Sequence, residues 1–174
     1  MKKILALLLA LSMALGLAAC SGQDGKESDN SGDSDLAYIQ EKGTLVVGIT
    51  EFEPMDYTDA DGNWIGFDAD MARAFAESLG VEAQFQVIAD WDSKVMELEG
   101  KTVDVVWNGM TLTEDVLTAM ECSNPYFSNG QVVIVPADKA GDYQTEESLA
   151  DLQFAVENGS AGQEELDRLG YSYT

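Results

Sequence analysis

Histidine is absent from the 174-residue chain, and this absence limits the chemistry that the other side chains can perform. It excludes a Ser-His-Asp triad, a Cys-His pair and a His-ligated metal site. Glu51 and Asp90 are carboxylates that could act as a general acid or base, but neither belongs to a recognisable catalytic constellation. An enzyme with this sequence would therefore need to work with carboxylates, Lys, Tyr or hydroxyls; we predict no catalytic residue, no metal site and no cofactor, and a protein that is not an enzyme.

Three apolar segments predict the strands of a sheet. Residues 44–50 form a nearly continuous apolar run, which is typical of a strand buried on both faces. Residues 81–87 alternate between apolar and polar side chains, which is typical of a half-exposed strand, and residues 103–107 form a third run.

Two amphipathic helices are predicted between these strands. The first is expected to begin with Asp68 as its N-cap and to end at Gly80; the second begins at Asp92 and ends at Gly100. The apolar face of the first helix is expected to contain Met71, Phe75 and Leu79. This β-α-β-α-β order implies a parallel sheet with right-handed crossovers. Since ligands of such sheets bind beyond the carboxyl ends of the strands, the candidate loops follow Ile49, Ile88 and Trp107.

These loops carry an ordered set of short motifs. They are Gly43–Gly48, Pro54–Tyr57, Gly66–Ala72, Asp90–Trp91, Val103–Val105, Asn108–Thr113 and Ser123–Phe127. Each motif is weak alone, but their order and spacing, from Gly43 to about Gly170, resemble the extracellular solute-binding proteins, family 3, of amino-acid ABC importers. The resemblance implies the type II periplasmic-binding-protein-like fold, an α/β architecture in which two lobes joined by two crossing strands hold the ligand in the cleft between them.

The resemblance also implies an organisation into segments. They are a signal peptide at 1–19, a lipidated Cys and flexible tether at 20–35, a first α/β lobe at 36–130, a crossing hinge strand at 131–137 and the start of a second α/β lobe at 138–174. Residues 153–156 are expected to form the first strand of that second lobe. Residues 160–163 read as a capping box for a helix that ends at Gly170. Family members continue beyond this point, so we expect the second lobe to be incomplete and C-terminally truncated in this chain.

By position in the motifs, seven residues are predicted to bind the ligand. They are Phe52, Trp91, Asn108, Gly109, Thr111, Ser160 and Ala161. The resemblance implies that the two aromatic rings pack the ligand's side chain and that Gly109 and Thr111 provide a carbonyl and a hydroxyl. It also implies a contact at the helix N-terminus that Ser160 begins, a place suited to an anion. Asn108, beside them, can donate and accept hydrogen bonds. Each residue also has a structural alternative, as a packing residue, a turn residue or a helix cap.

The chain departs from the family motif at one position. The motif reads Thr-Pro-Glu-Arg, and its Arg clamps the ligand's carboxylate with two hydrogen bonds. Here residues 113–116 read Thr-Glu-Asp-Val, so Val116 stands where the Arg is expected and cannot donate. Arg73 and Arg168 fall at no matching position. The ligand is then held by amides and hydroxyls alone, or lacks a free carboxylate, or is a cation.

The N-terminal segment predicts export. Lys2 and Lys3 precede an apolar run at 4–17, which is shorter than the ~20 residues of a membrane span. The tetrad Leu-Ala-Ala-Cys that ends at Cys20 resembles the lipobox of bacterial lipoproteins, in which the Cys receives a diacylglycerol and becomes the new N-terminus. Residues 21–34 contain no apolar side chain and predict a flexible tether. A plain signal peptide with an accidental Cys is the alternative.

The net charge of −23 argues against binding to nucleic acid. We therefore predict a monomeric substrate-binding lipoprotein of an ABC importer, extracytoplasmic and anchored to the bacterial cell membrane by lipid on Cys20. It would capture an amino acid or a related small polar solute and deliver it to the permease subunits. Relatives of the same fold leave alternatives open. These are a ligand-sensing domain of a membrane receptor, the non-catalytic lobe of a peptidoglycan lyase and a secreted cyclohexadienyl dehydratase-like enzyme.

Overall fold

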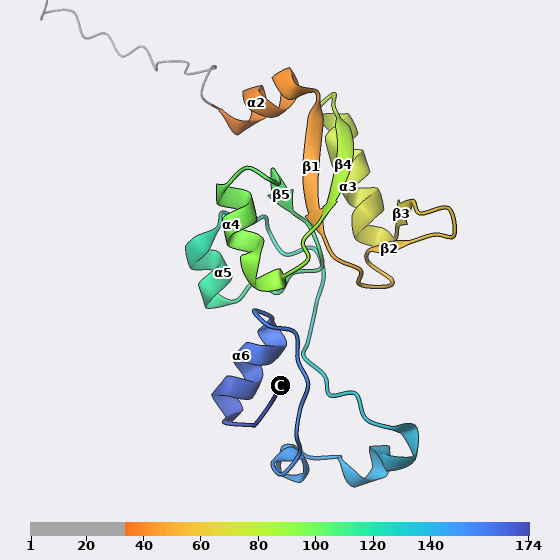
Figure 1. The fold of residues 1–174 in the computed structure, drawn as a ribbon, viewed down its shortest axis with the longest axis vertical. Coiled ribbons are helices and arrows are strands. Elements are labelled where there is room, and N and C mark those ends of the chain that lie inside the picture. The colour runs from red at the N-terminus through yellow and green to blue at the C-terminus, as the bar shows by residue number, and fades with distance from the viewer. Residues whose placement is uncertain (1–33) are drawn as a thin grey trace, which may run out of the picture. The chain divides into compact units, whose positions relative to one another are not determined.

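The computed structural model describes residues 34–174 (Figure 1). The predicted signal peptide at 1–19, the lipidation residue Cys20 and nearly all of the predicted tether at 20–35 lie outside the described residues. No helix between residues 34 and 174 has the length and apolar character needed to cross a bilayer.

A three-stranded parallel sheet forms the centre of the first α/β part (Figure 1). Strand β1 (Thr44–Ile49) lies between β4 (Glu82–Val87) and β5 (Val105–Val106) and runs parallel to both. It pairs with β4 along its whole length, from Thr44 opposite Glu82 to Ile49 opposite Val87. The central place of β1 explains why its sequence is almost continuously apolar. The predicted parallel sheet is confirmed.

The remaining elements connect and cover these strands. A short antiparallel pair, β2 (Tyr57–Thr58) and β3 (Trp64–Ile65), follows β1 and was not predicted. The helices are α2 (Asp35–Lys42), α3 (Phe67–Ser78), α4 (Lys94–Glu99), α5 (Glu114–Ala119) and α6 (Ala161–Leu169). Three short 3-10 turns lie at Trp91–Ser93, Ala137–Asp142 and Glu146–Leu149.

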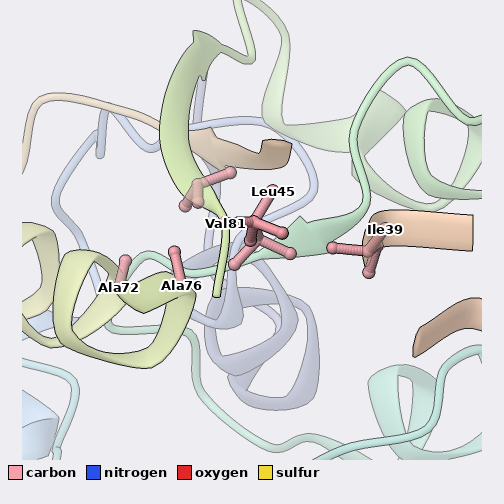
Figure 2. Packing of buried hydrophobic residues seen from close by; sticks show 6 residues of the cluster. Ile39, Leu45, Ala72, Ala76 and Val81 are labelled. Atoms are coloured by element: carbon pink, nitrogen blue, oxygen red, sulfur yellow. The ribbon is translucent and has the colours of Figure 1, made fainter. Parts of the chain in front are cut away.

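Helix α3 packs on the sheet through alanines, which corrects the predicted apolar face. The core cluster contains Ile39, Leu45, Val47, Ala72, Ala76 and Val81 (Figure 2). Of the predicted face residues, Met71 and Phe75 are instead 41% and 44% exposed, whereas Leu79 packs against the core cluster as predicted. The small side chains of Ala72 and Ala76 allow the helix backbone to approach the strands closely.

The predicted caps of two helices also need correction. Asp68 is the second residue of α3 rather than its N-cap, and Gly66 occupies the cap. Carbonyls of Pro54 and Met55 accept from the first amides of α3, so no capping side chain is needed. Gly66 is required there, because a Cβ would lie 2.4 Å from the Met55 oxygen. Asp92 does not cap α4: it lies within the 3-10 turn Trp91–Ser93, whose N-cap Asp90 accepts from the Asp92 amide, and Ser93 is the N-cap of α4.

The second part of the chain contains fewer strands than predicted. Residues 131–137 form no strand, because no strand among residues 34–174 lies beside them to complete a ladder. Val132 and Ile134 are accordingly 82% and 92% exposed. The strand predicted at 153–156 is reduced to a single parallel bridge between Phe154 and Tyr173. Helix α6 agrees with its prediction, since Ser160 caps it and Gly170 ends it in the left-handed conformation.

Candidate functional site

A cavity of about 210 Å³ lies at the carboxyl ends of the parallel strands, against the N-terminus of α6. All of the predicted binding residues line it: Phe52, Trp91, Asn108, Gly109, Thr111, Ser160 and Ala161. The loops after β1, β4 and β5 each contribute to its wall, as the topology predicted. All of these residues belong to one compact unit, residues 38–174. That they bind a ligand stays a prediction.

Asn108 joins the ends of two strands beside the cavity. Its Oδ1 accepts from the backbone amide of Thr50 at 3.0 Å, and its Nδ2 donates to the Thr50 hydroxyl. The side chain therefore fixes the loop after β1 to the loop after β5. This contact favours a structural role for Asn108, as a residue that positions the wall of the cavity.

Gly109 is held in the left-handed conformation, with φ of 51°. Its amide donates to Oδ2 of the buried Asp68 at 2.8 Å. A Cβ at this position would lie 3.1 Å from the ring of Phe52, so both the backbone angle and the close ring favour glycine. Asp68 also accepts from the hydroxyl of Tyr126 at 2.8 Å. One buried carboxylate thus fixes the Gly109 loop against the Phe52 ring.

A second buried carboxylate, Asp56, lies close to Asp68. Asp56 is fully buried, and neither of its carboxylate oxygens has a hydrogen-bond partner among the described residues. Burial, together with the charge of the nearby Asp68, raises the pKa of Asp56 to about 7, against the opposing effect of the Ala69 amide. Burial also raises the pKa of Tyr126, with a further contribution from its hydrogen bond to Asp68. Sequence reasoning missed this group, although both aspartates belong to motifs that it singled out.

Val116 lies where the sequence predicted, in the third position of α5 and at the wall of the cavity. Its amide donates to the capping hydroxyl of Thr113 at 3.4 Å, and its side chain is buried. The prediction that residue 116 faces the cleft is confirmed.

The Thr111 hydroxyl accepts from Nδ2 of Asn129 at 3.1 Å. The segment after residue 127 therefore also contributes to the wall of the cavity.

The far wall of the cavity is the N-terminus of α6. The Ser160 hydroxyl accepts from the Gln163 amide at 3.2 Å, while the Gln163 side chain accepts from the Gly159 amide at 2.7 Å. This reciprocal arrangement resembles the predicted capping box. It differs in that the Gln163 side chain accepts from the amide of Gly159 rather than from that of the N-cap residue Ser160. Across the cavity, the Thr113 hydroxyl donates to Oε1 of Glu164 at 3.1 Å.

Lys94, the first residue of α4, was not predicted and is the one lysine among the residues that line the cavity. Its ammonium donates to the carbonyl oxygens of Gly159 at 3.0 Å and Trp91 at 3.3 Å, and it lies 5.2 Å from the centre of the Trp91 ring.

The carboxylates of the lining belong to Glu51, Glu157 and Glu164. Asp90, the other catalytic candidate from the sequence, is a cap and does not line the cavity. Residues 34–174 contain no cluster of three or more potential metal ligands.

The family model described as bacterial extracellular solute-binding proteins, family 3, matches residues 45–165. The chain belongs to this family, and its fold is the type II periplasmic-binding fold, with the second lobe present in part. The probable histidine-binding protein of Neisseria gonorrhoeae is 36% identical over 139 residues, which are 80% of this chain and 49% of that protein. The chain thus spans about half the length of this curated relative.

Solved structures show the same fold. The holo form of ArgBP from T. maritima is 34% identical, with a TM-score of 0.73 over 79% of this chain and 61% of that one. A variant of domain 1 of the same T. maritima protein, in its arginine-bound form, is 38% identical, with a TM-score of 0.51 over 55% of this chain and 74% of that one. An enzyme also belongs to the relatives: the cyclohexadienyl dehydratase of Pseudomonas aeruginosa is 28% identical over 132 residues, 75% of this chain and 49% of that protein.

Proposed function

We propose that this protein captures an amino acid or a related small polar solute in the cavity and acts as the extracytoplasmic binding component of an ABC importer. The observation that supports this most strongly is the meeting of the predicted binding residues around one cavity. The family and the names of several relatives, which are histidine-binding, cystine-binding and arginine-binding proteins, support the same proposal.

The lining suits a small zwitterion. The rings of Phe52 and Trp91 offer apolar surfaces for a side chain, and the hydroxyl of Thr111 offers a polar contact. On the other side, the first amides of α6 provide a partial positive charge that suits a carboxylate. Carboxylates of the lining, such as that of Glu51, suit the ligand's ammonium group.

The membrane location and the permease partner belong to the same proposal. The Leu-Ala-Ala-Cys tetrad supports lipidation at Cys20, and the polar residues 21–34 would then tether the folded part to the outer face of the cell membrane. Membership of the family of bacterial extracellular solute-binding proteins supports, as part of this proposal, delivery of the ligand to permease subunits.

A thermal-shift screen of the full gene product against the twenty L-amino acids, L-cystine, small amines and peptides tests the proposal. A ligand at a hundred times its Kd stabilises the folded state by about 2.7 kcal/mol, which shifts the melting temperature by several degrees. Trp91→Ala should abolish the shift, while Trp64→Ala, remote from the cavity, should keep it. No shift with any amino acid, or equal shifts in both variants, would contradict the proposed site.

The dehydratase among the relatives supports a second candidate, an enzyme acting on a cyclohexadienyl compound. Glu51 is the sequence-predicted candidate acid or base that lines the cavity. Incubation with such a compound, followed by NMR for the dehydrated product, distinguishes the two. We expect no turnover; turnover that Glu51→Gln abolishes would establish the enzymatic alternative.

A further inference from the structure

Lys94 carries a buried positive charge that forms no ion pair within 4.0 Å with a carboxylate of the described residues. The residue is 8% exposed. The ion pairs within 4.0 Å among residues 34–174 are Lys42–Asp104, Arg73–Asp70 and Arg168–Glu165, and none of them includes it. An ammonium taken out of water without an anionic partner is unfavourable, so buried charges are normally paired. An anion bound in the cavity would therefore stabilise the buried Lys94 ammonium.

The ammonium is also incompletely hydrogen-bonded. It has three N–H donors, and carbonyl oxygens of Gly159 and Trp91 accept two of them within residues 34–174. The Trp91 ring, 5.2 Å away, adds a favourable contact but does not neutralise the charge. Because Lys94 lines the cavity, its remaining donor is within reach of a molecule bound there.

We propose that the Lys94 ammonium binds the carboxylate of the ligand and determines the specificity of the cavity for α-amino acids. This inference rests on the proposed function, because it requires an amino-acid ligand. Val116 offers only an apolar surface to the same cavity, whereas Lys94 brings a cation to it from α4. The N-terminus of the nine-residue α6 begins beside Gly159, so its partial positive charge acts on the same carboxylate.

The remaining charges of the lining define the ligand class further. Glu51, Glu157 and Glu164 also line the cavity, so a ligand with an acidic side chain would meet repulsion. We therefore assign an α-amino acid with a free carboxylate and a neutral or cationic side chain. Since one ammonium would contact both the ligand and the Gly159 carbonyl, the ligand would also strengthen the contact between α4 and the loop before α6.

Calorimetric titrations of Lys94 variants test the assignment with the full gene product. The twenty L-amino acids and L-cystine are titrated singly, and the carboxamide of each binder is titrated next. We expect wild type to bind the acid at least tenfold more tightly than the amide, because a charge-assisted hydrogen bond is lost. Lys94→Met should weaken binding of the acid about ten- to a hundredfold while changing that of the amide by less than threefold. Lys94→Arg should keep the preference for the acid.

Lys101→Met, an exposed lysine just after α4, is the matched control and should bind like wild type. The ligand-free Lys94→Met protein should melt at or above the wild-type temperature, since it loses an unpaired buried charge; Lys94→Gln repeats the test if the Met variant does not fold. Equal weakening of acid and amide would show that Lys94 only holds the Gly159 loop, which overturns the inference and leaves the proposed function intact. Failure of every amino acid to bind wild type would overturn both.

Discussion

Replacing Asp56 by Asn should make the stability of the protein less dependent on pH. Asp56 is fully buried without a hydrogen-bond partner for its carboxylate oxygens among the described residues, and burial together with the charge of Asp68 raises its pKa to about 7 from an ordinary value of 3.8. Between these two values the folded state holds a proton that the unfolded state has released. Folding stability from this group is therefore complete below pH 3.8 and is lost as the pH rises through 7.

The size of the effect follows from the two pKa values. At pH 5 the folded carboxyl is almost fully protonated, and at pH 8 it is almost fully ionised. At about 1.36 kcal/mol per pH unit, the wild type should lose about 2–3 kcal/mol of unfolding free energy between pH 5 and pH 8 through this group. The carboxamide of the Asp56→Asn variant does not titrate in this range, so that contribution should disappear.

Urea denaturation at pH 5, 6, 7 and 8 measures this difference. Asp59→Asn is the matched control, because a hydrogen bond from Asn63 lowers the pKa of Asp59, which is then ionised throughout this range. We expect the control to follow the wild type and Asp56→Asn to show a flatter profile, with its largest gain in relative stability at pH 8. Parallel profiles for wild type and Asp56→Asn would refute a buried Asp56 carboxyl that titrates near neutrality.

Three further outcomes are expected. Val116→Arg should weaken amino-acid binding at least tenfold, because it adds a second buried cation to the cavity that Lys94 lines; tighter binding of any α-amino acid would place the carboxylate beside residue 116 instead. The fluorescence of Trp91 should change on ligand addition and the change should vanish in Trp91→Phe but persist in Trp64→Phe, and a flat wild-type titration with binding confirmed calorimetrically would make Trp91 a packing residue. Cys20→Ser should move the protein from the membrane pellet into the soluble fraction, and its retention in the pellet would refute lipid anchoring.

The sequence predicted the parallel sheet well because hydrophobic periodicity reports burial directly. The continuous apolar run of β1 matches its central position between β4 and β5. The place of the cavity followed from topology, since the carboxyl ends of parallel strands meet at one edge. Helix α6 was predicted because Ser160 and Gly170 cap it locally and the signals of caps do not depend on distant contacts.

Long-range contacts account for what the sequence did not predict. The face of α3 was misassigned at Met71 and Phe75 because periodicity cannot tell which of two apolar stripes, alanines or larger side chains, packs on a sheet. Asp68 was read as a cap because its burial depends on Gly109 and Tyr126, distant in the chain. Lys94 resembled an ordinary surface lysine at a helix start, and only its contact with the Gly159 carbonyl, 65 residues away, reveals its burial.

The central claim is that an amino acid binds in the cavity between the strand ends and the N-terminus of α6. A crystal structure of the protein with its tightest-binding amino acid tests it most directly. The ligand should lie against Phe52 and Trp91, with its carboxylate toward Lys94 and the first amides of α6. A second, more apolar hollow of about 470 Å³ lies nearby and is lined by residues that include Pro54, Tyr126 and Phe127. A ligand found in that hollow, or outside both, would contradict the account.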